Sequence, residues 1–94
     1  MNTQELLVLA YERSGAKSWR KLALTLVISS TMVNAIRNGQ SKPGDELCIE
    51  IAHLAGADPY TALMQLNAER SEGKARRLYE KAARAAQSPS IAAE

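Results

Sequence analysis

The chain contains no phenylalanine and only one tryptophan, one cysteine and one histidine. The lone Cys48 excludes an internal disulfide framework, so we expect a reducing compartment and a cytoplasmic protein. The opening stretch MNTQELLVLAYER has neither a basic start nor an uninterrupted apolar span, which predicts neither a signal peptide nor a membrane helix. With large aromatic side chains so scarce, the core must be built from aliphatic residues and alanines, which is typical of short, closely packed helices.

The few residues that support catalysis or metal binding elsewhere form no recognisable site. His53 and Cys48 are five positions apart and do not share a helix face, as a pair of metal ligands would. Cys48 falls beside apolar positions, which predicts a buried thiol, and His53 is expected on the surface. Glycine-rich phosphate loops and paired carboxylates are also missing. We therefore expect no enzyme activity, no cofactor or metal, and no small-molecule ligand.

Charge is unevenly distributed along the 94 residues. Residues 1–43 hold six bases and two acids, for a charge of +4, whereas residues 44–94 hold six bases and eight acids, for −2. The N-terminal half is therefore the candidate for a polyanion partner, although a chance scatter of surface charges would look the same.

Apolar spacing and capping signals predict an all-α chain of five to six helices. Thr3 is the expected cap of the first helix, Ser18 of the second, Ser29 of the third, and Asp58-Pro59 begins the fifth. The expected helices end near Gly15, Leu26, Asn38-Gly39, Gly56 and Arg70, and a sixth covers 74–87. Residues 1–70 would form one domain, 71–87 a C-terminal helix, and the polar 88–94 a mobile tail.

The stretch 24-LTLVISSTMV-33 favours a strand by composition but lies between two helical segments. A lone strand would leave backbone groups unpaired, so we interpret the stretch as the end of one helix, a turn, and the start of another. Ala23 is small enough for two helices to touch at a steep angle. The apolar residues that would face a shared core are Leu22, Leu26, Ile28, Val33 and Ile36.

This pattern resembles the helix-turn-helix of the lambda-repressor-like family, which includes phage repressors and Cro proteins. The matching residues are 22-LA-23, Leu26, Ile28-Ser29, Val33 and 36-IRNG-39, followed by Ser41 and Pro43. More narrowly, 36-IRNGQSKP-43, 52-AHLAGADP-59 and 67-NAER-70 resemble small regulators of filamentous phages. Val27 departs from the family, which usually has glycine in the turn. Because β-branched residues avoid positive φ, we expect another backbone path there rather than a left-handed residue.

The resemblance implies that the second helix of the pair lies in the major groove of DNA. The predicted base contacts are Ser30, Thr31 and Asn34, with Asn38 as a further candidate that could serve only to cap the helix. The predicted phosphate contacts are Lys17, Trp19, Arg20, Arg37 and Lys42. Trp19 could equally be a packing residue, and Arg37 could instead pair with an acidic neighbour.

A single helix in the major groove contacts few base pairs, so proteins of this family act as dimers on two half-sites. The expected dimer interface comprises Leu63, Leu66, Leu78, Tyr79 and Ala82. The alternative is that the C-terminal helix packs back on its own domain.

The resulting expectation is a sequence-specific, double-stranded DNA-binding repressor, encoded by a phage or prophage and acting as a homodimer on a pseudo-palindromic operator. Its place would be the cytoplasm of a bacterial host, at the nucleoid. The alternative is a small helical protein-interaction module on the same fold, such as a phage inhibitor or an antitoxin-like partner.

Overall fold

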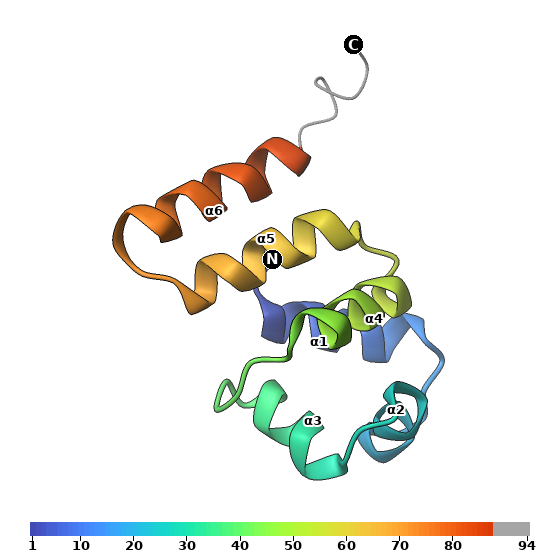
Figure 1. Ribbon diagram of the computed structural model, residues 1–94. Helices are drawn as coiled ribbons and strands as arrows, with labels where there is room; N and C mark the ends of the chain where they lie inside the picture. Colours follow the sequence, from blue (N-terminus) through green and yellow to red (C-terminus); the bar gives the residue numbers. More distant parts are fainter. Residues whose placement is uncertain (88–94) are drawn as a thin grey trace.

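The computed structural model describes residues 1–87, and these residues form six α-helices and no strand (Figure 1). The helices are α1 (Thr3–Arg13), α2 (Trp19–Leu26), α3 (Ser30–Arg37), α4 (Asp45–Ala55), α5 (Pro59–Arg70) and α6 (Gly73–Gln87). The all-α prediction is confirmed, and 24-LTLVISSTMV-33 is the end of α2, a turn and the start of α3. The tail predicted at 88–94 lies outside the described residues.

Three of the six helices, α2, α3 and α5, begin at the side chains that the sequence nominates as caps. Ser18 accepts a hydrogen bond from the backbone N–H of Lys21 at 3.1 Å, and Ser29 accepts one from Met32 at 3.0 Å. The Asp58 carboxylate accepts the Thr61 N–H at 2.8 Å. Each cap satisfies a backbone donor that the first turn leaves free, which fixes where these helices begin.

The first helix departs from the prediction, because Asn2 rather than Thr3 is its cap. Asn2 Oδ1 accepts the backbone N–H of Glu5 at 2.8 Å, and Glu5 Oε1 accepts the Asn2 N–H at 2.9 Å. This reciprocal pair satisfies two donors, whereas Thr3 as cap would satisfy one. Thr3 instead lies inside the helix with its side chain buried.

The core lies between α1, α4 and α5, and α2 and α3 close one side of it (Figure 1). Alanine allows α1 and α4 to approach closely, since Ala10, Ala52 and Ala55 are fully buried. Larger side chains fill the remaining space: Leu7, Leu22, Val33, Ile36, Ile51 and Leu66. The second and third helices therefore share one apolar core with the rest of the chain.

The turn between α2 and α3 contradicts the expectation for Val27. Val27 adopts the left-handed conformation, with φ 58° and ψ 45°, and its N–H donates to the Leu24 carbonyl at 3.2 Å. A β-branched residue in this region costs about 1–3 kcal/mol. The conformation persists because the caps and core residues on both sides fix the chain path. The Val27 side chain is 87% exposed, so packing within the chain does not offset the cost.

Replacing Val27 with glycine is expected to stabilise the fold by about 0.5–1 kcal/mol, because glycine adopts positive φ without strain but gains entropy in the unfolded chain. Urea unfolding followed by circular dichroism measures the change. Lys21→Gly is the matched control: it introduces the same residue within α2 and should destabilise the fold by about 0.5–1 kcal/mol. Lower stability of Val27→Gly would mean that the valine side chain holds the turn.

The last helix packs back along α5 (Figure 1), the arrangement weighed as the alternative to intermolecular pairing. Leu66 is fully buried in the core, so its assignment to a dimer interface is wrong: it has no surface to offer a partner. Leu63, Tyr79 and Ala82 are half-buried, whereas Leu78 is 68% exposed. Of the five residues assigned to the interface, Leu78 therefore offers a partner the most apolar surface.

Candidate nucleic-acid interface

One face of α3 is polar and exposed while the opposite face is buried. Val33 and Ile36 lie in the core, whereas Ser30, Thr31 and Asn34 are exposed. These three side chains offer hydroxyl and amide groups that can donate and accept hydrogen bonds. Asn38 is also exposed and stands at the C-cap position of the helix, with φ −89° rather than a left-handed backbone.

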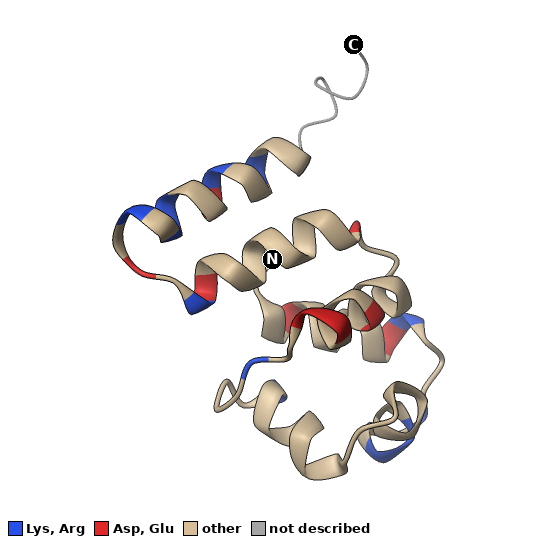
Figure 2. Cartoon of the chain, viewed as in Figure 1, with Lys and Arg blue, Asp and Glu red and all other residues tan. Residues whose placement is uncertain are grey.

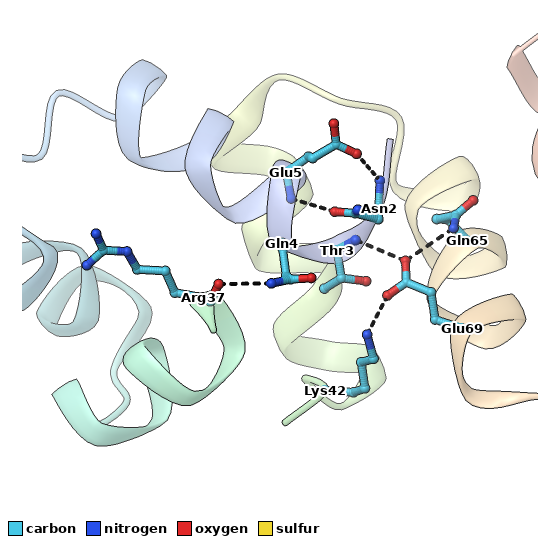
Figure 3. A network of polar contacts seen from close by, with 8 residues as sticks. All are labelled: Asn2, Thr3, Gln4, Glu5, Arg37, Lys42, Gln65 and Glu69. Atoms are coloured by element: carbon cyan, nitrogen blue, oxygen red, sulfur yellow. Dashed lines mark hydrogen bonds and ion pairs between the residues drawn. The ribbon is translucent and has the colours of Figure 1, made fainter. Parts of the chain in front are cut away.

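The C-terminal end of α3 is held by α1. Gln4 Nε2 donates a hydrogen bond to the backbone carbonyl of Arg37 at 3.1 Å (Figure 3). Gly39 follows with φ +77°, and a Cβ there would lie 3.1 Å from the Gln4 side chain. The positive φ favours glycine at this position, and a larger residue would also displace the Gln4 side chain by a few tenths of an ångström. The role of Gln4 could not be predicted from local sequence patterns, because its hydrogen-bond partner is 33 residues away.

An aromatic and cationic stack joins the first three helices. The ring of Trp19, at the start of α2, stacks on Tyr11 of α1 with centroids 4.3 Å apart and an interplanar angle of 18°. The Arg37 guanidinium lies over the Trp19 ring, with its Cζ atom 4.4 Å from the ring centroid. Trp19 is half-buried, so it is a packing residue in this structure, and Arg37 contacts an aromatic ring rather than an acid.

Exposed basic side chains lie on and just before α2, the helix that packs beside α3. Lys17 precedes α2, and Arg20 and Lys21 lie in its first turn; all three are exposed. Figure 2 shows cations on α2, whereas the acids of residues 1–70 lie on or next to α1, α4 and α5. Lys21 was absent from the predicted phosphate contacts, although its place beside Arg20 could have indicated it. The N-terminus of α2 adds unpaired N–H groups and a positive dipole end beside these cations.

Lys42 is a predicted phosphate contact that is engaged in an ion pair. Its Nζ lies 2.9 Å from Glu69 Oε1 (Figure 3), and its side chain remains about one-third exposed. Lys42 therefore contributes less free positive charge than Lys17 or Arg20. To contact a phosphate, the Lys42 ammonium group would have to bind the phosphate and the Glu69 carboxylate together, or break its ion pair with Glu69.

Glu69 is the centre of the network that ties this loop to α1 and α5. Its carboxylate accepts hydrogen bonds from the Thr3 N–H at 2.9 Å, from Lys42 at 2.9 Å and from Gln65 at 3.2 Å (Figure 3). Burial alone would raise the pKa of Glu69, but the hydrogen bonds from Lys42, Thr3 and Gln65 outweigh it and leave the pKa below its ordinary value. The carboxylate is therefore held charged at the junction of α1, α5 and the loop after α3.

Cys48 and His53, the two residues considered for metal binding, lie on α4, away from the exposed face of α3. Burial, reinforced by the charges of Asp45 and Glu69, raises the pKa of the Cys48 thiol to about 11, so the thiol stays protonated at neutral pH. His53 is exposed on α4, as expected. Within residues 1–87 no three His, Cys, Asp or Glu side chains are grouped to hold a metal ion.

Within the same described residues, no helix has the length and apolar character needed to cross a bilayer. Comparisons with protein-family models, with curated proteins and with solved structures found no match to this chain.

Proposed function

We propose that the protein is a sequence-specific, double-stranded DNA-binding transcriptional repressor in which α2 and α3 form a helix-turn-helix of the lambda-repressor-like type. The observation that supports it is the exposed polar face of α3, with exposed cations on and just before the neighbouring helix α2. Asn34 can form two hydrogen bonds to adenine, and the hydroxyl groups of Ser30 and Thr31 can donate to or accept from the base edges. The exposed cations Lys17 and Arg20 supply phosphate contacts, which fix the register on the duplex.

The repressor acts as a homodimer on a pseudo-palindromic operator, because one α3 helix reads only a few base pairs. The exposed Leu78 and the half-buried Ala82 on α6 support a symmetric contact between copies. The resemblance of 36-IRNGQSKP-43, 52-AHLAGADP-59 and 67-NAER-70 to small regulators of filamentous phages supports a phage or prophage origin. Bound at a promoter, the dimer would block transcription by occupying the DNA in the bacterial cytoplasm.

Replacing Asn34 with alanine tests base reading directly. On the best duplex selected from a random pool, affinity is expected to fall about 5- to 150-fold, equivalent to about 1–3 kcal/mol for a bidentate base contact. Affinity for duplexes that differ at the contacted base pair should change little, so preference at that position relaxes. Fluorescence anisotropy at one fixed salt concentration measures both.

His53→Ala, which alters an exposed side chain on α4, is the control and should leave all affinities unchanged. An equal loss of affinity for every duplex after Asn34→Ala would remove this residue from base reading. Lack of duplex binding by the unaltered protein at low salt would contradict the proposed function as a whole, since phosphate contacts are strongest there.

One observation favours a second candidate, a protein-interaction module. Leu24 is 69% exposed and lies three positions before the exposed Val27, so two large apolar side chains flank the turn next to α3. Exposed apolar side chains that adjoin a functional surface can mark a protein contact. An affinity for a partner protein that is insensitive to salt, together with no binding to any duplex, would support this reading over DNA.

A further inference from the structure

A row of cations runs along the outer side of α6. Lys74, Arg77, Lys81 and Arg84 are spaced three, four and three positions apart, so they share one face of the helix, and all four are exposed. We refer to these four residues as the α6 cation row. Ala83, which packs inward, is two positions from Lys81 and so lies on the opposite side of the helix. The row therefore points away from the body of the protein.

The charge of this helix is high for its length. Residues 73–87 contain five bases and one acid, for a charge of +4. The acid, Glu80, pairs with Arg76 at 3.6 Å, and Arg76 lies outside the row. Figure 2 shows the cations along α6 at the opposite end of the molecule from α3. The overall charge of −2 for residues 44–94 conceals this local concentration.

We propose that the α6 cation row is a second, sequence-independent binding surface for the phosphate backbone of double-stranded DNA, so that the protein joins two DNA segments. The inference rests on the proposed function, which brings DNA to α3. From Lys74 to Arg84 the row spans about 15 Å at 1.5 Å per residue. This length matches the major groove, about 12 Å wide, so the two ends of the row can contact phosphates of both strands.

The surroundings of the row favour duplex DNA over other polyanions. Single-stranded nucleic acid is bound by cations interleaved with exposed aromatic rings, but Tyr79 is half-buried on the side toward α5. An anionic membrane would need several large apolar side chains to insert, whereas the exposed Leu78 stands beside the row with small alanines such as Ala75 and Ala85 around it. A row of cations without interleaved aromatic rings and without several large apolar side chains fits the regular phosphate backbone of a duplex best.

The position of α6 places the second DNA segment away from the first. The helix contacts α5, and α5 together with α1 and α4 separates it from α3 (Figure 1). A straight duplex bound along α3 passes the other end of the molecule and does not reach the row. Leu78 and Ala82 lie on the neighbouring flank of α6, so a dimer formed through them leaves the row exposed.

A capture experiment tests the bridging. The selected operator duplex is fixed to beads, the protein is added, and retention of a second, labelled duplex of unrelated sequence is measured. The unaltered chain should retain the labelled duplex. The fourfold variant Lys74→Gln, Arg77→Gln, Lys81→Gln and Arg84→Gln should lose retention at least about tenfold while keeping operator affinity within about twofold. The double variant that carries Lys74→Arg and Lys81→Arg keeps the positive charges and should retain the labelled duplex as the unaltered chain does.

Salt dependence gives the second readout. For binding to the unrelated duplex, the slope of log affinity against log salt should fall by about three to four units in the fourfold variant, since about four phosphate contacts are lost. Sedimentation and circular dichroism check that the variant keeps the fold and oligomeric state of the unaltered chain. Unchanged slope and retention in a folded fourfold variant would overturn the second surface.

Failure of this inference is distinguishable from failure of the proposed function. If α3 does not read DNA, Asn34→Ala leaves operator affinity unchanged, whereas the fourfold variant still loses binding to the unrelated duplex. If the row does not bind DNA, only Asn34→Ala has an effect. Vesicles of phosphatidylcholine with about one-third phosphatidylserine provide the membrane arm. Vesicle binding that the fourfold variant loses, with duplex retention unchanged, would assign the row to anionic lipid and overturn the inference.

Discussion

Replacing Glu69 with glutamine is expected to lower the free energy of unfolding by about 2 kcal/mol at neutral pH, because a charged acceptor in a partly buried site is lost and its three donors, one of them the Lys42 ammonium, are left poorly satisfied. The Glu69 carboxylate accepts from the Thr3 N–H, Lys42 and Gln65, and its side chain is only 12% exposed. A glutamine carbonyl oxygen can keep one of these donors, but its NH₂ group faces the Lys42 ammonium, another donor. Urea unfolding followed by circular dichroism measures the loss.

The effect should shrink as the solution becomes acidic. Because the pKa of Glu69 is below its ordinary value of 4.5 in the fold, the stabilisation from its charge is complete above the pKa of the unfolded chain. It is lost as the pH falls through the folded pKa, where the carboxylate becomes neutral like glutamine. The stability difference between the unaltered chain and Glu69→Gln should therefore be constant above about pH 5.5 and decline below about pH 4.5.

Glu50→Gln is the matched control for Glu69→Gln, since Glu50 is exposed on α4. This change should alter the free energy of unfolding by less than about 0.5 kcal/mol at neutral pH. A difference between Glu69→Gln and the unaltered chain that stayed constant down to pH 3 would show that the charge of Glu69 is not what stabilises the junction.

The helices were predictable because their signals are local. The caps Ser18, Ser29 and Asp58 each act within three residues along the chain, and apolar spacing identifies the buried face of each helix. Asn2 was missed in favour of Thr3, although the Asn2 to Glu5 spacing is the local signature of a capping box. Local signals therefore fix where elements begin, provided that competing caps are compared.

The strained turn shows how tertiary structure overrides local preference. Val27 is a poor residue for a left-handed backbone, and the sequence favoured another path for that reason. The structure keeps the conformation because Leu26 and Ile28 on either side must both reach the core. A penalty of about 1–3 kcal/mol at one residue is smaller than the loss of that burial would be.

The candidate site was only partly accessible from the sequence. The exposure of Ser30, Thr31 and Asn34 follows from helical spacing, and these side chains lie on the face where they were expected. The ion pair of Lys42 with Glu69 joins residues 27 positions apart, and no periodicity reveals such a contact. The charge of +4 on residues 73–87 is visible in the sequence, but the acids elsewhere in residues 44–94 outweigh it in the sum for that half of the chain.

Replacing Trp19 with alanine is expected to lower the free energy of unfolding by about 2–3 kcal/mol. The estimate combines a stacked aromatic pair at about 0.5–1.5 kcal/mol, a cation–π contact at about 0.5–1 kcal/mol and the loss of part of the buried ring area. Trp19 contacts both Tyr11 of α1 and Arg37 of α3, so its loss also frees the C-terminal end of α3. Duplex affinity should therefore fall together with stability.

Trp19→Phe separates packing from a direct phosphate contact. Phenylalanine keeps a ring between Tyr11 and Arg37 but has no N–H to donate. If Trp19 acts by packing, this variant should keep operator affinity within about twofold and lose less than about 1.5 kcal/mol of stability. If its indole N–H binds a phosphate, affinity should fall as far as in Trp19→Ala while stability remains near that of the unaltered chain. Circular dichroism is the readout for unfolding, because Trp19 is the only tryptophan and both variants remove its fluorescence.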